Sequence, residues 1–300
     1  MKNMNRLFIT TGIISALTAC GGGSGGSNTS APNTKGQLTL SLTDAPVDSL
    51  QSVVITVTGV SLKPQNGEEK TVTFTEAKKI DMLDLQNGVV ASLLDKYSLE
   101  AGAYEWVRLE LSTADNALYV EDNLGGMVGL KIPSGFQSGL KLNSGFTIPQ
   151  GGDANFTIDF DLRKSVVKPT GQADYFLKPS LRLIDNTTTG TLSGNISSGL
   201  LQTACANTSV FSGLVYVFSG SNIVPDDYDG LAVEALTAAA VTYNGTTGNY
   251  SYKMPFLASG DYTIAFSCNL DDQAKDEILS FTQIQNVAIV SKITTTINFQ

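Results

Sequence analysis

The sequence of 300 residues contains no histidine, and this absence removes several chemistries before any motif is considered. Without an imidazole there is no Ser-His-Asp triad, no Cys-His pair and no histidine metal ligand. Charged residues are also scarce, at 16% of the chain, against roughly 25% in typical soluble domains. A net charge of −9 and a pI near 4.5 disfavour nucleic acid as a partner, because phosphates require a basic surface.

Other catalytic signatures are also not convincing. The spacing Gly-x-Ser-x-Gly occurs at residues 22–26, inside a glycine-rich segment, and Ser-x-x-Lys occurs at residues 138–141 and 165–168, but we expect none of them to offer an activated serine. The glycine pair Gly125-Gly126 lacks the Lys-Ser/Thr pair of a phosphate-binding loop. We therefore expect a non-enzymatic protein with no catalytic residues, no cofactor and no metal. The apolar fraction of 42% is enough to bury a core.

The first residues are typical of an exported protein. Lys2 and Arg6 precede an apolar run over residues 7–17, which is shorter than the roughly 20 residues that span a bilayer and therefore predicts a secretory signal peptide. The run ends in Leu17-Thr18-Ala19-Cys20, which resembles the lipobox of bacterial lipoproteins. The resemblance implies cleavage after residue 19 and acylation of Cys20, palmitate included. An ordinary signal peptide with a chance cysteine is the alternative.

Residues 20–35 follow as a predicted lipidated tether, rich in glycine and serine and poor in apolar side chains. In proteobacterial lipoproteins an aspartate directly after the cysteine favours the inner membrane, and this chain has Gly21. The resemblance therefore implies anchoring in the outer membrane, with the leaflet left open. Loss of residues 1–19 removes Lys2 and Arg6 and changes the net charge to −11.

Two further cysteines, Cys205 and Cys268, agree with an oxidising compartment. Cys268 ends an alternating run with Tyr262, Ile264 and Phe266, so we expect its side chain to point inward. We predict a disulfide between them, with two buried free thiols as the alternative.

Apolar residues recur with a period of two along most of the chain, which predicts strands. In residues 53–62 the apolar positions change parity after Gly59, which indicates a β-bulge there. Spacings of three and four within residues 81–99 allow one short helix. We expect an all-β protein with two β-sandwich domains, immunoglobulin-like or prealbumin-like: residues 36–185, a linker at 186–190, and residues 191–300.

Residues 36–185 resemble a bacterial lipoprotein domain of unknown function, an exported, anchored β-domain that supplies no catalytic residues. The motifs that carry the resemblance are Ser41-Leu42-Thr43-Asp44-Ala45-Pro46, Gly102-Ala103-Tyr104, Val107-Arg108-Leu109, Pro133-Ser134-Gly135, Gly139-Leu140-Lys141-Leu142, Asp159-Phe160-Asp161 and Leu177-Lys178-Pro179-Ser180-Leu181-Arg182. Residues 190–300 are more loosely similar to the prealbumin-like modules of carboxypeptidase regulatory domains. The residues that carry this likeness are Val215-Tyr216-Val217-Phe218 and Phe256-Leu257-Ala258-Ser259-Gly260-Asp261-Tyr262-Thr263-Ile264.

Three groups of side chains are candidates for chemistry. Asp159 and Asp161 share a predicted strand face as an acid/base pair for a glycoside, although pairing with Lys178 and Arg182 across strands is favoured. Trp106, with Tyr104 on the same face, is a candidate sugar-stacking platform or a residue at a domain junction.

The third group consists of acidic loops with oxygen ligands suited to calcium, although solvated turns are the simpler interpretation. These loops are Asp226-Asp227-Tyr228-Asp229-Gly230 and Asn269-Leu270-Asp271-Asp272, with Asp276 and Glu277.

The sequence thus predicts a lipid-anchored protein of the bacterial cell envelope that acts as a non-catalytic binding or structural module. Its partners would be the membrane, through the anchor at Cys20, and an envelope protein or a glycan. A surface carbohydrate-binding or adhesive protein, assisted by calcium, is the second interpretation. A carboxylate-based hydrolase is the third.

Overall fold

The structure is a computed structural model that describes residues 34–44, 50–122, 125–133, 139–205, 212–231, 233–269, 271 and 278–300, with only the backbone of Arg163. Residues 34–300 form one compact unit. The predicted leader, Cys20 and most of the tether lie outside the described residues. No helix within the described ranges is long and apolar enough to cross a bilayer.

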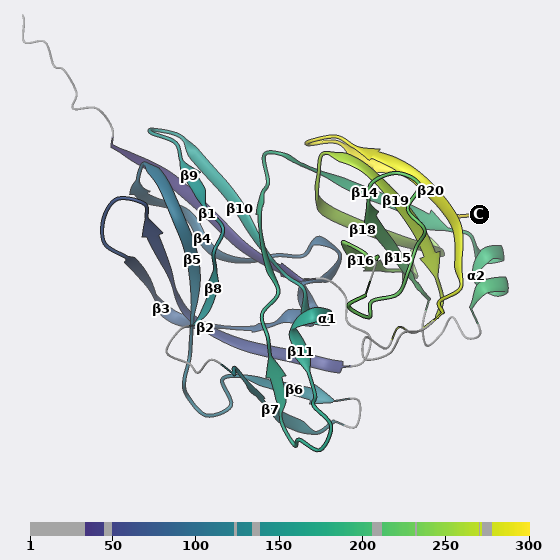
Figure 1. Ribbon diagram of the computed structural model, residues 1–300, viewed down its shortest axis with the longest axis horizontal. Coiled ribbons are helices and arrows are strands. Elements are labelled where there is room, and N and C mark those ends of the chain that lie inside the picture. The colour runs from purple at the N-terminus through teal and green to yellow at the C-terminus, as the bar shows by residue number, and fades with distance from the viewer. Residues whose placement is uncertain are drawn as a thin grey trace, which may run out of the picture. The chain divides into compact units, whose positions relative to one another are not determined.

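The all-β fold class is confirmed, because four sheets account for the strands that the structure describes. Two sheets use residues 35–185 and form the first sandwich, and two use residues 189–296 and form the second sandwich (Figure 1). Within the described residues no strand of one group is hydrogen-bonded to a strand of the other. The division into two domains stays a prediction, because residues 34–300 also behave as one compact unit.

The first sandwich contains a four-stranded sheet with a parallel pair at its centre, β1 against β10. In spatial order its strands are β13 (Leu181–Asp185), β10 (Asp153–Phe160), β1 (Lys35–Asp44) and β4 (Ala91–Glu100).

The facing sheet is larger and is organised around the long strand β2. In spatial order its strands are β11 (Val166–Val167), β12 (Tyr175–Leu177), β7 (Met127–Lys131), β6 (Tyr119–Asp122), β2 (Leu50–Pro64), β5 (Gly102–Leu111) and β8 (Leu140–Leu142), with β3 (Lys70–Asp81) on β2 and β9 (Phe146–Ile148) on β5.

The bulge predicted at Gly59 is confirmed. The register of β2 shifts between Val57 and Gly59 against both β3 and β5. A Cβ atom on Gly59 would lie 2.5 Å from the carbonyl oxygen of Val72, so only glycine allows the backbone of β3 to come this close. The shift returns Val60 and Leu62 to the face that Val57 occupies, and all three are fully buried.

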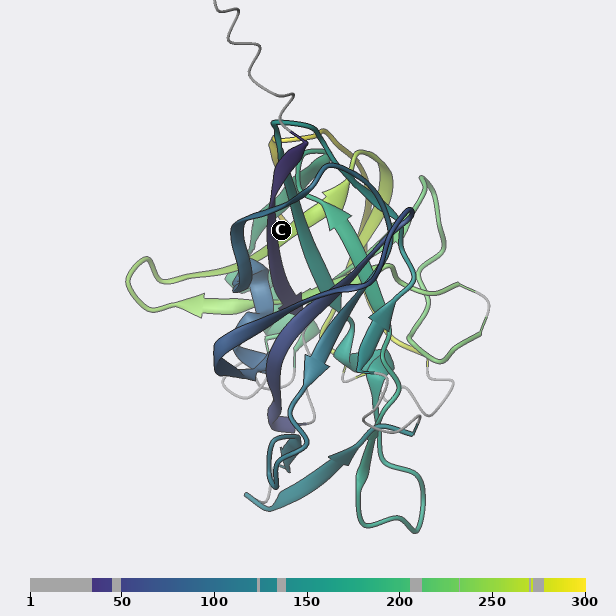
Figure 2. The same cartoon turned by 90° about the vertical axis from the view of Figure 1, so that its left-hand side faces the viewer.

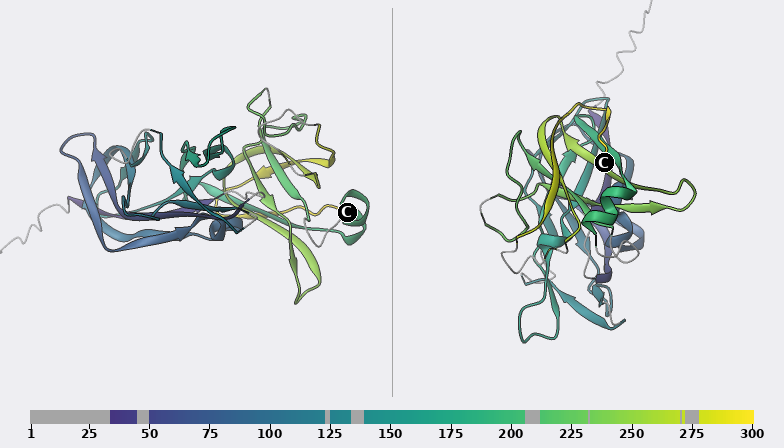
Figure 3. Two further views of the ribbon diagram at one scale, coloured as in Figure 1. Left: turned by 90° about the horizontal axis from the view of Figure 1, so that it is seen from below. Right: turned by 90° about the vertical axis from the view of Figure 1, so that its right-hand side faces the viewer.

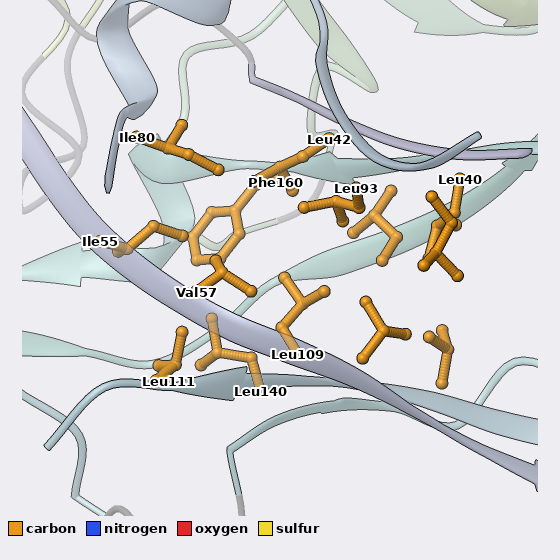
Figure 4. Close-up of a cluster of buried hydrophobic side chains, with 14 of the residues drawn as sticks. Leu40, Leu42, Ile55, Val57, Ile80, Leu93, Leu109, Leu111, Leu140 and Phe160 are labelled. Carbon is orange, nitrogen blue, oxygen red and sulfur yellow. The ribbon is translucent and has the colours of Figure 1, made fainter. Parts of the chain in front are cut away.

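The core of the first sandwich is a continuous apolar cluster between its two sheets. Figure 4 shows side chains from the two facing sheets meeting there, with Phe160 close to Ile55 and Val57. β1 contributes the alternate residues Leu40 and Leu42, and β5 contributes Leu109 and Leu111, as the period of two predicts.

The second sandwich has two four-stranded sheets. One runs β17 (Thr242–Asn244), β18 (Asn249–Ala258), β14 (Thr189–Ile196) and β21 (Thr294–Thr296), and the other runs β16 (Thr237–Ala240), β15 (Leu214–Ser219), β19 (Gly260–Ser267) and β20 (Phe281–Ile289). The face of β15 that carries Val215 and Val217 packs in the core between the sheets, whereas Leu214, Tyr216 and Phe218 pack in a smaller cluster.

The helical segments differ from expectation. Within residues 81–99, where one short helix was allowed, the structure has a short 3-10 helix, η1 (Met82–Gly88), and the apolar residues that follow it belong to the strand β4. Two short helices were not predicted: α1 (Leu162–Ser165), capped by Asp161, and α2 (Ser198–Ala204), capped by Ser197. Each cap side chain accepts a hydrogen bond from a backbone N–H of the first turn, which is the usual reason for a helix to begin there.

Each sandwich contains a turn that is closed by a tyrosine hydroxyl, although the sequence resembles a different family in each of the two regions. The hydroxyl of Tyr104 donates to the carbonyl of Glu100 at 2.9 Å, and the hydroxyl of Tyr262 donates to the carbonyl of Ala258 at 2.8 Å. In each case the tyrosine follows a Gly-x pair and bonds four residues back, across the turn between two strands. This is the arrangement that closes a corner in many β-sandwiches.

Candidate functional site

The candidate site lies at the carboxyl end of β1, where two polar side chains are buried. The hydroxyl of Thr43 lies within hydrogen-bond distance of two carbonyls, those of Leu85 at 3.0 Å and Val89 at 2.9 Å. Asp44 accepts the backbone N–H of Leu162 at 3.1 Å. The Thr43-Asp44 pair therefore ties the end of β1 to η1 and to α1, which are far apart in the sequence.

Asp159 and Arg182 form an ion pair beside this junction. They lie directly opposite each other on β10 and β13, and the guanidinium donates from Nε to the Asp159 carboxylate at 3.0 Å and also from Nη2. Asp159 is 6% exposed, so its charge is largely withdrawn from water. The predicted pairing of Asp159 with a cation on the neighbouring strand is confirmed for Arg182.

The predicted pairing of Asp161 with Lys178 is wrong. β10 ends at Phe160, and Asp161 caps α1 by accepting the backbone N–H of Lys164 at 3.3 Å. Its carboxylate lies 3.7 Å from the ammonium of Lys164. Lys178 instead contributes its backbone N–H, which donates to the carbonyl of Ser165. Asp161 is therefore not on the strand face that carries Asp159.

Lys164 is a residue that the sequence analysis missed. Its ammonium also lies 3.7 Å from Glu234 and 4.9 Å from the ring centroid of Tyr228. The sequence signal that could have revealed it is the Asp161-x-x-Lys164 spacing, because the side chain of a helix N-cap commonly accepts a hydrogen bond from the backbone N–H three residues later.

A small cavity adjoins these groups, with a volume of about 30 Å³. Its lining includes Thr43, Asp44, Asp159 and Arg182 from the first sandwich and Lys253 from the second. A space of this size holds about one or two water molecules, whereas ligand pockets are commonly about 300 Å³ or more. The site gathers three of the motifs that carry the family resemblance, but it is a buried polar junction without room for a sugar.

Burial raises the pKa of Asp161 above its ordinary value, and the nearby Lys164 opposes this only in part. An acid whose pKa is raised on folding stabilises the fold most at pH values below its unfolded pKa, and this contribution is lost as the pH rises through the folded pKa. The ionised carboxylate is thus the less favourable form at neutral pH.

Asp161→Asn is therefore expected to unfold at an equal or higher urea concentration than the parent at pH 7, because asparagine keeps a cap acceptor and cannot ionise. The advantage should shrink as the pH falls below about 4, where the parent aspartate is protonated. Urea unfolding at pH 7 and at pH 3.5 measures this difference. A loss of stability at pH 7 that disappears at pH 3.5 would show that the charge of Asp161 is favourable in the fold and would contradict this expectation.

The expectation that Tyr104 and Trp106 share a face is wrong. The register of β5 against β2 shifts here, because Lys63 lies opposite Trp106 while the next residue, Pro64, lies opposite Tyr104. Tyr104 consequently turns inward, is 3% exposed and stacks on Phe146.

Trp106 remains half-buried beside two cations. The guanidinium of Arg108 lies 5.1 Å from its ring centroid and the ammonium of Lys141 lies 4.4 Å away. Arg108 is also bound to Glu110 and Glu69. Neighbouring aromatic and charged side chains thus already occupy the surroundings of both rings of the proposed platform.

The two acidic loops do come together. The carboxylate of Asp271 accepts the backbone N–H of Tyr228 at 3.3 Å and the hydroxyl of Tyr216 at 3.1 Å. Glu234 accepts the backbone N–H groups of Asp229 and Gly230. Among the described residues no group of three or more acidic, cysteine or histidine side chains is arranged to hold a metal ion. Leu270, Asp272, Asp276 and Glu277 lie outside the described residues.

The disulfide between Cys205 and Cys268 is confirmed, with a Cα–Cα distance of 5.2 Å. It joins the end of α2 to the residue after β19. Cys205 is buried and Cys268 packs against the core of the second sandwich, as the alternation before Cys268 predicts.

These features define an all-β protein of sandwich architecture. Its buried carboxylates form an ion pair, as Asp159 does, or cap a helix, as Asp161 does. Residues 35–179, just under half of the chain, match the model of the family described as Domain of unknown function (DUF4382). The match ends at Pro179, two residues before β13, the strand that supplies Arg182.

No curated protein sequence matches this chain. Among solved structures, the TIE protein of Bacillus anthracis is 14% identical with a TM-score of 0.20 over 89% of this chain, and the match spans 34% of that protein. A minor pilin of Streptococcus agalactiae is 10% identical with a TM-score of 0.20, covering 87% of this chain and 94% of the pilin. The major pilin of Streptococcus pyogenes is 12% identical with a TM-score of 0.16, covering 89% of this chain and 97% of the pilin. At these TM-scores the likeness does not extend to function.

Proposed function

We propose that this chain is a lipid-anchored protein of the bacterial cell envelope whose β-sandwiches act as a non-catalytic binding or structural module. The observation that carries the proposal is the sequence Leu17-Thr18-Ala19-Cys20, placed at the end of an apolar run and followed by a glycine-rich and serine-rich segment. In this proposal Cys20 becomes the first residue of the mature protein and receives acyl chains on its sulfur and on its new amino group. Several chains together give firm membrane attachment, whereas one chain alone binds reversibly.

The disulfide supports export. Disulfides persist in oxidising compartments and are rare in the reducing cytosol, and Cys205 and Cys268 are bonded within the second sandwich. Gly21, in place of an aspartate, favours the outer membrane. An exported protein held by Cys20 would place both sandwiches outside the cytoplasm.

The arrangement of the carboxylates favours a non-catalytic role. A glycoside hydrolase requires two carboxyl groups that converge on a cleft. Here Asp159 is held by Arg182 and Asp161 caps α1, beside a cavity of only about 30 Å³. A binding or structural module needs no such pair, and its specificity resides on its surface.

Cys20→Ser is expected to abolish acylation, because serine cannot form the thioether that holds the diacylglyceryl group. The full chain, expressed in a Gram-negative host, should partition into the detergent phase of Triton X-114 at its mature mass and incorporate an alkyne analogue of palmitate. The Cys20→Ser variant should take up no label and should keep its leader by intact mass, so that any membrane association it retains comes from the uncleaved apolar run. The matched control is the double variant Cys205→Ser and Cys268→Ser, which removes the other two thiols and should still be labelled. If the Cys20→Ser variant stays with the membrane at the mature mass, the proposal is wrong.

A second candidate function is adhesion through a surface glycan, with calcium assisting at the acidic loops. The observation in its favour is that some tyrosine rings lie on the surface, with Tyr97 41% exposed and Tyr243 58% exposed. Crosslinking in intact cells followed by mass spectrometry distinguishes the two candidates. A structural module should be linked to another envelope protein, whereas an adhesin should be linked to a glycan.

A further inference from the structure

The β17–β18 hairpin extends away from the sheet to which it belongs. Figure 2 shows it in yellow-green as a long arm, and Figure 3 shows the same projection from below. β17 pairs only with β18 among the described strands, and residues 242–249 are all exposed. Residues 242–249 of the arm thus cover no core, whereas Tyr250 at its base is half-buried and packs against the core of the second sandwich.

The tip of the hairpin is held by its own hydrogen bonds. The side-chain oxygen of Asn244 accepts the backbone N–H groups of Thr246 at 3.0 Å and Thr247 at 3.2 Å. The backbone N–H of Gly248 donates to the carbonyl of Asn244 at 2.8 Å, and Gly248 has a φ of 70°, which glycine adopts without strain. The exposed arm is therefore pre-organised, which lowers the entropy that a ligand must offset on binding.

Two tyrosines form a pair on this arm. Tyr243 and Tyr250 are directly opposite on β17 and β18, with ring centroids 4.9 Å apart and ring planes inclined by 46°. Tyr243 is 58% exposed. No hydrogen bond is made by either phenolic hydroxyl within the described part of the chain. The pair offers a tilted aromatic surface with two free polar groups at its edge.

The chemistry of the surrounding residues is neutral and polar. Residues 235–252 contain no charged side chain, in a protein whose net charge is −9. The exposed positions are threonine, asparagine, glycine and tyrosine, the composition that antibody loops use for adaptable hydrogen bonding around rigid aromatic contacts. An anionic or cationic ligand would find no complementary charge on the arm itself.

We propose that the Tyr243–Tyr250 pair is a binding site for a neutral carbohydrate. The apolar face of a pyranose ring stacks on the tyrosine rings, and the phenolic hydroxyls and neighbouring amide and hydroxyl groups bond its hydroxyls. A hairpin tip of eight exposed residues is far fewer than the roughly 20 to 30 residues that each partner contributes to a stable protein interface. A few sugar units fit this area better than a folded protein does.

This inference goes beyond the anchored module proposed above and does not depend on acylation of Cys20. Sites of this size bind single ligands weakly, so dense display of the ligand is needed for detection. The test uses the detergent-solubilised full chain, fluorescently labelled, on a printed array of neutral oligosaccharides with sialylated and uronic-acid oligosaccharides for comparison.

We expect the parent chain to bind neutral oligosaccharides. Tyr243→Ala and Tyr250→Ala should each reduce binding by about tenfold, because each removes one ring of the pair. Tyr243→Val keeps a residue that favours strands but lacks the ring, so it should lose binding in the same way even if alanine weakens the hairpin. Tyr243→Phe keeps the ring and should retain most of the binding. Tyr97→Ala is the matched control, since Tyr97 is also an exposed tyrosine but lies on β4 of the first sandwich.

The proposal is overturned by absence of binding to every neutral oligosaccharide, by preference for the charged oligosaccharides, or by undiminished binding of Tyr243→Val. An equal loss in Tyr97→Ala also overturns it, because the signal would then not come from the hairpin. None of these outcomes affects the anchoring proposal, which is decided by the partition and mass of the Cys20→Ser variant.

Discussion

The double variant Cys205→Ala and Cys268→Ala is expected to lower the free energy of unfolding of the second sandwich by about 4 kcal/mol. The bond closes a loop of 63 residues, and in the chain-entropy model a loop of this length restricts the unfolded chain by about that amount. The loop contains β15, β16, β17, β18 and β19, so three of the four strands of one sheet and two of the four strands of the other lie within it.

Two spectroscopic signals separate the two sandwiches in this experiment. Trp106 is the only tryptophan and lies in the first sandwich, so its fluorescence reports unfolding there. Far-UV circular dichroism reports both sandwiches. In urea the variant should show a large shift of the circular dichroism transition. If the sandwiches unfold independently, the Trp106 transition should stay where it is in the parent.

The control for this experiment is Cys20→Ser, which removes a thiol outside the described residues and should leave both transitions unchanged. A common shift of both signals would show that the sandwiches unfold as one cooperative unit and would contradict the predicted division into domains. An unchanged circular dichroism transition would show that the disulfide contributes nothing measurable.

Arg182→Ala is expected to cost about 3 kcal/mol in the free energy of unfolding, because it leaves the Asp159 carboxylate buried without its partner. Asp159 is 6% exposed and receives two hydrogen bonds from the guanidinium, so water cannot easily replace them. The Trp106 fluorescence transition in urea measures the loss directly.

Lys178→Ala is the matched control for Arg182→Ala. The two cations are four residues apart and both were predicted partners of the aspartates. Within the described residues the Lys178 ammonium makes no ion pair, and only the backbone N–H of Lys178 is hydrogen-bonded. A change within about 0.5 kcal/mol is expected for Lys178→Ala. Asp159→Asn combined with Arg182→Ala should cost less than the two single losses added together, because no unpaired charge remains. Equal losses in the Lys178 and Arg182 variants would contradict the assignment of the ion pair.

The sequence predicted the strands because alternation is a local property. Leu38, Leu40 and Leu42 lie on one face of β1 whatever the sheet contains, and all three are buried. The bulge at Gly59 could also be predicted from the sequence, since a change in the parity of apolar positions along a buried strand requires a bulge. The secondary structure of residues 81–99 was harder to predict, because apolar residues at spacings of three and four also occur where a 3-10 turn is followed by a strand.

At the candidate site the same reasoning worked only where the strands were regular. Asp159 and Arg182 sit on uninterrupted strands, so an ion pair between them followed from the pattern. Asp161 looked equivalent, but the chain leaves the sheet one residue earlier and turns into α1. Trp106 and Tyr104 were assigned one face for a similar reason, and the irregularity between β5 and β2 separates them.

The sequence by itself determined that the chain is all-β and that Cys205 and Cys268 can pair, because each depends on residue types and spacings along the chain. The proposal of an anchor at Leu17-Thr18-Ala19-Cys20 rests on the sequence alone. Only the tertiary structure decided that Thr43, Asp44, Asp159 and Arg182 meet at one buried junction, and that Tyr243 and Tyr250 form an exposed pair. The reason is that long-range strand pairing and small irregularities in register decide which side chains meet and which stay in water, and neither is encoded in the local pattern of apolar and polar residues.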